Sequence, residues 1–134
     1  MEKPTNMHWQ GVKRVFRFKK KTANRGIAFD PNSNCTELNV YCDADWAVDI
    51  DTRRSTTGWI ALLNGGPVAW SSRKQTVTAT STTEAEFVAL CATTKAVIWL
   101  KRLMSNLDQQ QTQPKPIRCD NQRAITLMRK REGP

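Results

Sequence analysis

Three acidic residues, Asp43, Glu86 and Asp120, occur where divalent-cation chemistry would need them. The flanking sequence predicts that Asp43 and Asp120 each end a β-strand, and that Glu86 lies near the start of a long helix. Acidic side chains at the carboxyl ends of adjacent strands, joined by one from a helix, can hold two divalent cations about 3.5–4 Å apart for phosphodiester hydrolysis. Carboxylate oxygens favour Mg²⁺ or Mn²⁺. These three residues are therefore the candidate catalytic and metal-ligating residues.

Helical phase separates Glu86 from its neighbour Glu84. At about 100° per residue, Glu86 lies within about 40° of a stripe that should face the core. The members of this stripe are Leu90, Thr93, Val97, Leu100 and Met104. A buried carboxylate is costly unless a cation or hydrogen bonds compensate it, which marks Glu86 as functional. Glu84 lies on the far side and completes a capping box with Ser81, so its predicted role is structural.

Each candidate also has an ordinary structural interpretation. Glu86 can reach water from the first turns of its helix, where acidic residues favour the helix dipole. Asp43 can be a turn residue that ends a strand, and Asp120 can share the capping of a helix with Asn121. On spacing alone, both interpretations remain open for all three residues.

Several nearby residues are assigned structural roles. Cys42 and Cys119 each precede an aspartate, and the alternation of side chains along a strand predicts that both thiols pack in the core. The acidic residues of the loop after the first strand are expected to be ordinary solvated residues. These are Asp45, Asp49 and Asp51. Core packing is also predicted for three tryptophans, in preference to base stacking. They are Trp59, Trp70 and Trp99.

The hydrophobic periodicity predicts an α/β order of elements. These are a basic amphipathic helix at Thr5–Lys19, a short strand at Ile27–Phe29, a strand from Leu38 to Asp43, a hairpin of Gly58–Leu63 with Val68–Ser71, a helix from Ser81 to Leu107, a loop at Asp108–Pro116, a strand at Ile117–Asp120 and a helix from Asn121 to Arg131. The hairpin strands are apolar throughout, which predicts burial on both faces. The glycines of the hairpin turn are expected to supply positive φ. The helical crossover predicts a mixed sheet in which the last strand is parallel to the first.

Composition points to a polyanionic partner. The chain has 134 residues, enough for one domain, with a net charge of +9 and a pI of about 9.8. Nucleic acid is the first candidate, although a run of charges is often only a solvated surface. The residues predicted to contact phosphates are Lys13, Arg14, Arg17, Lys20, Lys21 and Arg123.

Cysteine spacing argues against a structural zinc site. Cys35, Cys42, Cys91 and Cys119 lie far apart without a C-x-x-C pair, and His8 is the single histidine. Free or buried thiols are expected. The N-terminus does not resemble a signal peptide, and no apolar run approaches the roughly 20 residues that span a bilayer. The sequence therefore predicts an intracellular protein with no membrane partner.

Five segments together resemble the ribonuclease H domain of copia-type (Pseudoviridae) retrotransposon Pol polyproteins. In chain order they are Tyr41–Ala47, Arg54–Gly58, Pro67–Gln75, Ser81–Leu90 and Cys119–Ile125. The resemblance extends over about Leu38–Leu127, and it places the family's catalytic carboxylates on Asp43, Glu86 and Asp120. Residues 6–29 resemble the stretch that joins reverse transcriptase to ribonuclease H in those polyproteins. The implied domains are a basic connecting segment at 1–34 and a ribonuclease H-like domain at 35–134.

The resemblance implies a ribonuclease H-like fold and a metal-dependent nuclease of a transposable element. Such a hydrolase cuts the RNA strand of RNA–DNA hybrids during reverse transcription, with two Mg²⁺ or Mn²⁺ ions and with a reverse transcriptase domain or another part of the Pol polyprotein as partner. In the family, the last helix is followed by a further strand and by a segment with a fourth acidic residue. The chain is expected to lack these, and Glu132 is not a convincing substitute. Activity of this chain alone is therefore left open by the sequence.

Two alternatives stand beside the nuclease. The chain can be a catalytically inactive remnant that binds only nucleic acid or protein through its basic surface. It can also be a different enzyme of the same fold, such as an integrase-like core, because fold does not determine function. The segments Ser81–Leu90 and Cys119–Ile125 speak against the second alternative.

Overall fold

The structure is a computed structural model that describes residues 3–29 and 37–130. Several predictions concern residues outside this part of the chain: the loop at Asp30–Ser33, Cys35, the domain boundary at 34/35, the helix end at Arg131 and the role of Glu132. Within it, no helix is both long enough and apolar enough to cross a membrane.

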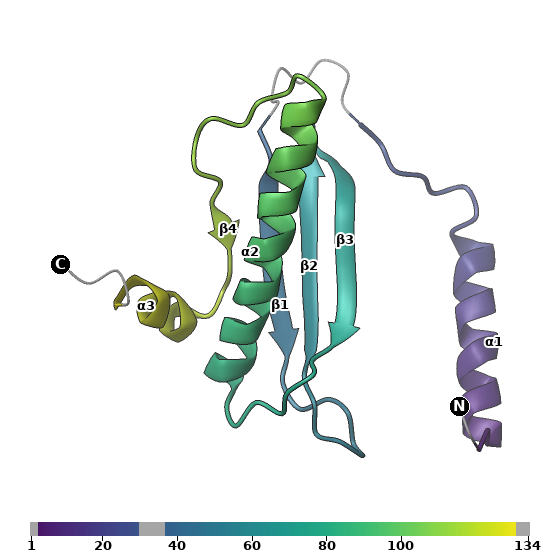
Figure 1. Ribbon diagram of the computed structural model, residues 1–134. Helices are drawn as coiled ribbons and strands as arrows, with labels where there is room; N and C mark the ends of the chain where they lie inside the picture. Colours follow the sequence, from purple (N-terminus) through teal and green to yellow (C-terminus); the bar gives the residue numbers. More distant parts are fainter. Residues whose placement is uncertain (1–2, 30–36, 131–134) are drawn as a thin grey trace.

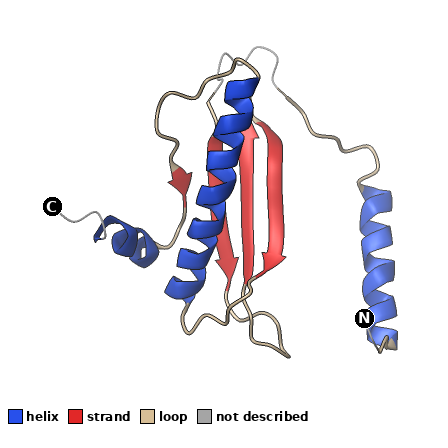
Figure 2. Cartoon of the chain, viewed as in Figure 1, coloured by secondary structure: helices blue, strands red, loops and turns tan. Residues whose placement is uncertain are grey.

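A four-stranded mixed sheet forms the centre of the fold. Its strands are β1 (Asn39–Asp45), β2 (Thr56–Leu63), β3 (Gly66–Lys74) and β4 (Ile117–Arg118), in the spatial order β3-β2-β1-β4. The neighbours β1–β2 and β2–β3 are antiparallel, whereas β4 is parallel to β1. The long helix α2 (Thr82–Asn106) lies across one face of the sheet (Figures 1 and 2). The predicted α/β class, hairpin and parallel strand pair are confirmed, and this topology is compatible with a ribonuclease H-like fold.

Helix α2 begins at a polar cap. Ser81 has extended backbone geometry, and its side-chain oxygen accepts the Glu84 backbone N–H at 3.2 Å. The Glu84 carboxylate accepts two hydrogen bonds from Thr80, from its backbone N–H at 2.6 Å and its hydroxyl at 2.7 Å. The predicted capping box is therefore half right, because the glutamate reaches one residue further back than Ser81. Hydrogen bonds to Thr80 lower the pKa of Glu84.

The core lies between β1, β2 and one stripe of α2. Alternation along β1 buries Val40 and Cys42, and the α2 stripe predicted to face the sheet is buried along its whole length. The main cluster consists of Leu38, Val40, Ala61, Val97, Leu100 and Met104. Each fully buried aliphatic side chain of this kind contributes about 1.5–3 kcal/mol. This cluster fixes the height and rotation of α2, and with them the position of Glu86.

The prediction that the hairpin strands are buried on both faces is wrong. Ile60 and Val68 are exposed, and Trp70 is 62% exposed, because α2 covers only one face of the sheet in the described residues. The core role predicted for Trp70 fails for this reason. Trp99 lies outside the buried stripe of α2 and is 55% exposed. Trp59 is partly buried and packs against the core as expected.

The hairpin turn uses its residues differently from the prediction. Positive φ occurs at Asn64 (50°) and Gly65 (76°), and not at Gly66. Gly66 is instead a close-approach position, since a Cβ there would lie 2.4 Å from the ring of Phe29. The predicted strand at Ile27–Phe29 is absent from the sheet. The segment lies against the hairpin through the Phe29 ring, and three residues without a strand partner do not form a ladder.

Two helices flank the sheet. Helix α1 (Asn6–Lys21) has the predicted amphipathic pattern, but it buries none of its residues and contacts none of the other described elements. It stands apart from the sheet in Figure 1. Helix α3 (Gln122–Lys130) is capped by Asn121 as predicted, since the Asn121 side-chain oxygen accepts the N–H groups of Arg123 and Ala124 at 3.1 and 3.0 Å.

Candidate metal centre

Because β1 and β4 are parallel, Asp43 near the end of β1 and Asp120 after β4 lie toward the same end of the sheet. Helix α2 begins near the carboxyl end of β1 (Figure 1). The prediction that each aspartate ends its strand is wrong. Asp43 lies inside β1, which continues to pair with β2 as far as Asp45. Asp120 lies two residues beyond β4, because the chain leaves the sheet after Arg118 and turns into the cap of α3.

Glu86 lies at the centre of this arrangement. It is 5% exposed, on the α2 stripe that faces the sheet, as its helical phase predicts. Burial raises its pKa, and the negative charges of Asp43 and Asp120 raise it further. In the described part of the chain no lysine or arginine forms an ion pair with Glu86. The structure thus brings the three predicted carboxylates into mutual electrostatic contact without a compensating protein cation.

The tightest grouping contains a thiol. Single ligand atoms of Glu86, Cys119 and Asp120 all lie within 4.8 Å of one another. The Cys119 thiol donates a hydrogen bond of 3.7 Å to the Glu86 carboxylate. Asp43 adjoins this group without belonging to it, and one of its oxygens accepts the Ala44 N–H at 2.8 Å. The Ala44 amide also hydrogen-bonds Glu86 and partly offsets the rise in its pKa.

Cys119 packs against the core as predicted, but it also has a polar partner that the prediction did not include. Its thiol is half-buried and packs against the cluster of Cys42, Leu90 and Ala124, but it also faces Glu86. Strand alternation does not apply to Cys119, because β4 ends one residue earlier. Cys42 is buried as predicted, and burial raises its pKa to about 12. All three described cysteines are free, as expected, including the exposed Cys91.

The ligand atoms fit a divalent cation. Glu86 and Asp120 each supply a hard oxygen donor, and these two atoms lie within 4.8 Å of each other. Glu86 is buried and has no basic partner among the described residues, which favours a cation beside it. Asp43 supplies a further carboxylate at the edge of the group. These carboxylates are the residues that would hold Mg²⁺ or Mn²⁺.

A shallow depression of about 360 Å³ extends from Asp43 across the open face of the sheet. It is lined by Tyr41, Asp43, Gly58, Ile60, Trp70 and Ser72, among others. Arg118 borders it, with its guanidinium 5.2 Å from the Tyr41 ring and 2.6 Å from the Tyr41 hydroxyl. An aromatic surface next to a carboxylate suits a flat or extended ligand that must approach the metal centre.

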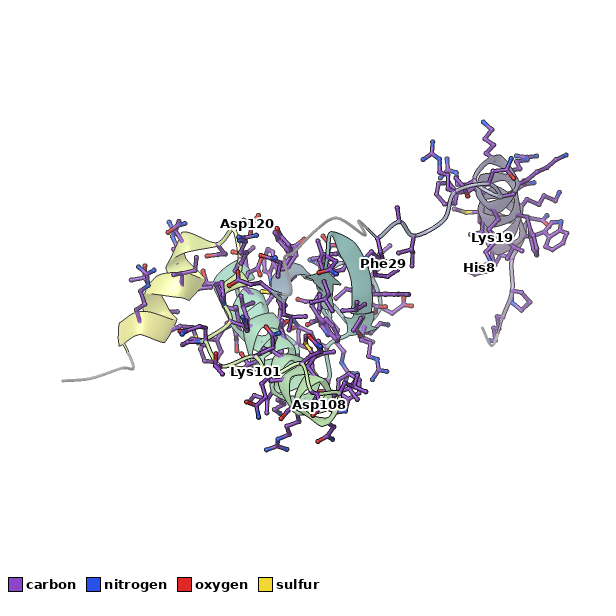
Figure 3. The ribbon with its side chains drawn as sticks, turned by 90° about the horizontal axis from the view of Figure 1, so that it is seen from above. His8, Lys19, Phe29, Lys101, Asp108 and Asp120 are labelled. Atoms are coloured by element: carbon purple, nitrogen blue, oxygen red, sulfur yellow. The ribbon has the colours of Figure 1, made fainter. Side chains whose placement is uncertain are left out.

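The predicted phosphate-contacting residues fall in two separate places. Arg123 is exposed in the first turn of α3, three residues after Asp120. The others lie on α1, where Lys13 is partly covered by the Trp9 ring at 5.4 Å and the remainder are exposed. Figure 3 shows Lys19 of α1 far from Asp120. Of the predicted phosphate-contacting residues, Arg123 therefore lies nearest in the chain to Asp120, and the α1 residues belong to a separate element.

One loop acid has a structural role that spacing did not reveal. Asp49 pairs with Lys74 at the end of β3 and accepts the Thr52 backbone N–H at 2.7 Å. The contact with Lys74 is the main cause, and the Thr52 contacts a further one, of a pKa of Asp49 that lies far below the usual range. Asp51 is exposed in this loop as predicted, whereas Asp45 is exposed but is the last residue of β1 and not part of the loop. Asp49 fixes the loop after β1 and takes no part in the metal centre.

Comparison with known proteins gives sequence relatives. The chain is 40% identical over 127 residues to the retrovirus-related Pol polyprotein from transposon RE2 of Arabidopsis thaliana, and 39% identical over 127 residues to that from transposon TNT 1-94 of Nicotiana tabacum. These matches cover 95% of the chain and 9% of each polyprotein, so the chain spans less than a tenth of their length. It is also 44% identical over 97 residues to the secreted RxLR effector protein 161 of Plasmopara viticola, across 72% of the chain and 68% of that protein. No protein-family model matches the chain, and no solved structure matches it significantly.

Proposed function

We propose that the chain, which is similar to one short region of the retrovirus-related Pol polyproteins of transposons, is a copia-type ribonuclease H-like domain. The proposed activity is metal-dependent hydrolysis of the RNA strand of RNA–DNA hybrids during reverse transcription. Asp43, Glu86 and Asp120 are the proposed metal ligands. Nucleic-acid recognition would depend on the shape of the hybrid and on the 2′-hydroxyl groups of its RNA strand.

One observation carries this proposal. Glu86 is buried without a basic partner among the described residues, and it lies close to Asp120 and beside Asp43. A structural ion pair would include a basic partner, which Glu86 lacks among the described residues. The Ala44 amide and the Cys119 thiol are hydrogen-bond partners of Glu86 but do not balance its negative charge, so a buried carboxylate next to two others supports a bound cation.

The chain's own residues contribute position and charge to the reaction. Divalent cations, when bound, supply Lewis acidity at the phosphoryl group and a nucleophile derived from water. Packing of α2 on the core holds the Glu86 carboxylate in place, and the Ala44 amide orients Asp43. Arg123 is available to contact a phosphate close to Asp120. The exposed face beside Asp43 gives an extended substrate access to the carboxylates.

The test is strand-resolved cleavage of a labelled RNA–DNA hybrid. We expect the chain to cut the RNA strand with Mg²⁺ or Mn²⁺, to leave duplex DNA intact, and to lose cleavage in Asp43→Asn. The matched control is Asp51→Asn, since Asp51 is exposed in the loop after β1 and does not belong to the group of proposed ligands. Equal cleavage by Asp43→Asn and Asp51→Asn would contradict the assignment, as would equal cleavage of duplex DNA.

A second function, binding without cleavage, is favoured by helix α1. This helix presents exposed basic side chains, has no acidic residue in its first turn and contacts no other described element. Under this alternative, a folded chain binds hybrid in a salt-dependent way, and Asp43→Asn leaves both affinity and metal response unchanged. Replacing Arg14 and Arg17 by glutamine would then weaken binding and reduce its dependence on salt concentration.

A further inference from the structure

We propose that Cys119 makes the metal centre a binding site for zinc-class divalent cations, with the Cys119 thiolate and the Glu86 and Asp120 carboxylates as protein ligands. The tight group in the structure is this set of one sulfur and two oxygens, and not the three carboxylates together. Three protein ligands with a fourth position open to solvent are typical of zinc sites that are not purely structural.

Interatomic distances support a tetrahedral site. Zinc–sulfur bonds are about 2.3 Å and zinc–carboxylate bonds about 2.0–2.2 Å, so a sulfur and an oxygen on one tetrahedral zinc are about 3.5 Å apart. The Cys119 sulfur lies 3.7 Å from the nearer Glu86 oxygen. A small movement of either side chain would therefore bring both atoms into coordination distance. Asp120 completes the group within 4.8 Å.

The environment of the group also favours a cation with some affinity for sulfur. Glu86 is nine-tenths buried, points at the Cys119 thiol and has no basic partner among the described residues. Mg²⁺ prefers oxygen and gains nothing from the thiol, whereas zinc binds thiolate strongly. Binding would transfer the thiol proton to solvent and form one metal–sulfur bond, with no change in oxidation state.

Sequence spacing had argued against zinc, because the cysteines are unpaired and there is one histidine. That argument concerns structural sites built from several cysteines or histidines. The fold instead places a single thiol beside two carboxylates, that of Glu86, 33 residues away in sequence, and that of the adjacent Asp120, a grouping that spacing does not reveal. Zinc would occupy the same carboxylates as the proposed catalytic cations. Competition between zinc and Mg²⁺ is the part of this inference that rests on the proposed function.

The direct test is optical titration of the full chain with Co²⁺, a spectroscopic substitute for zinc, under a reductant that contains no thiol. We expect a thiolate-to-cobalt charge-transfer band that Zn²⁺ abolishes by displacement. Cys119→Ser should lose the band, and Asp120→Asn should weaken cobalt binding by about tenfold or more. The matched control is Cys91→Ser, which should keep the band because Cys91 is exposed on the outer side of α2.

Nucleic-acid cleavage gives the second readout. Zinc should inhibit Mg²⁺-dependent cleavage by the unmodified chain and by Cys91→Ser at similar concentrations, and Cys119→Ser should require about tenfold more zinc. No charge-transfer band, or an equal band in Cys119→Ser, would overturn the inference. A chain that shows the band but cuts no hybrid would refute the proposed nuclease activity and leave the zinc site standing, so the two failures are distinguishable.

Discussion

The side-chain amide of Gln75 donates a hydrogen bond of 2.9 Å to the backbone carbonyl of Ala85, the residue before Glu86. The same amide donates to the Thr57 hydroxyl at 3.0 Å. Gln75 is 5% exposed, so these two bonds connect the end of β3, the start of β2 and the first turns of α2 inside the protein. They hold the backbone that positions the Glu86 carboxylate.

Gln75→Ala should therefore destabilise the fold by about 1–3 kcal/mol, since it leaves buried polar groups without a partner. Urea denaturation measures this loss. The matched control is Gln122→Ala, because Gln122 is exposed at the start of α3. Equal midpoints for the two variants would show that the Gln75 bonds do not contribute.

Glu86→Gln should change the dependence of stability on pH. The pKa of Glu86 is raised above its ordinary value of 4.5, chiefly by burial and then by Asp43 and Asp120. The folded state therefore favours the protonated carboxyl. This favourable contribution is present below the unfolded-state pKa and is lost as pH rises through the raised folded-state pKa.

Without divalent metal, Glu86→Gln should accordingly gain stability relative to the unmodified chain as pH increases from acid to neutral. Urea denaturation across that range measures the difference, and Glu84→Gln is the control, since hydrogen bonds to Thr80 lower the pKa of Glu84. A stability difference that stays constant with pH would contradict the assigned cause. Saturating Mn²⁺ should stabilise the unmodified chain and not Glu86→Gln.

Trp70 and Trp59 should respond differently to truncation. Trp70 is 62% exposed on the open face, so Trp70→Ala should cost less than about 1 kcal/mol of stability. Trp59 packs against both core clusters, and Trp59→Ala should cost about 3 kcal/mol or more. Thermal unfolding of the two variants tests the contrast. If Trp70→Ala proves the more damaging, the face assigned as open is covered in solution.

Gly66→Ala should displace the segment before β1 from the hairpin. The new Cβ would lie 2.4 Å from the Phe29 ring and 2.9 Å from the Ala28 carbonyl oxygen, and the second contact is with backbone. Limited proteolysis should cut this segment faster in Gly66→Ala than in Gly11→Ala, whose Cβ meets no atom within 4 Å. Equal cleavage rates would show that the Phe29 contact is not maintained.

The element order and the Glu86 position could be predicted from sequence because they depend on local periodicity. The buried stripe of α2 repeats at helical spacing, and β1 alternates strictly, so both patterns identify the face that meets the core. The parallel pairing of β4 with β1 could be predicted because parallel strands need a long crossover connection, and a helix such as α2 usually forms part of it.

What failed depends on contacts between distant segments. Apolar content at Ile60, Val68 and Trp70 could not show which sheet face lacks a covering helix. The contact between the Cys119 thiol and Glu86 depends on where β4 ends. That boundary is set by the Asn121 cap of α3 and not by strand periodicity. Asp49 and Lys74 are 25 positions apart in sequence, so no local pattern could predict that they form an ion pair.

The short pairing of β4 has a consequence for chain entropy. Asp120 follows a strand of two residues and a long irregular connection from α2, so few hydrogen bonds restrict its approach to Glu86. A cation bound by both Glu86 and Asp120 would cross-link the two ends of this loop in the folded state. Closing a loop of roughly 30 residues removes conformational freedom much as a disulfide does. Metal loading and the docking of β4 and α3 would then be a single cooperative event.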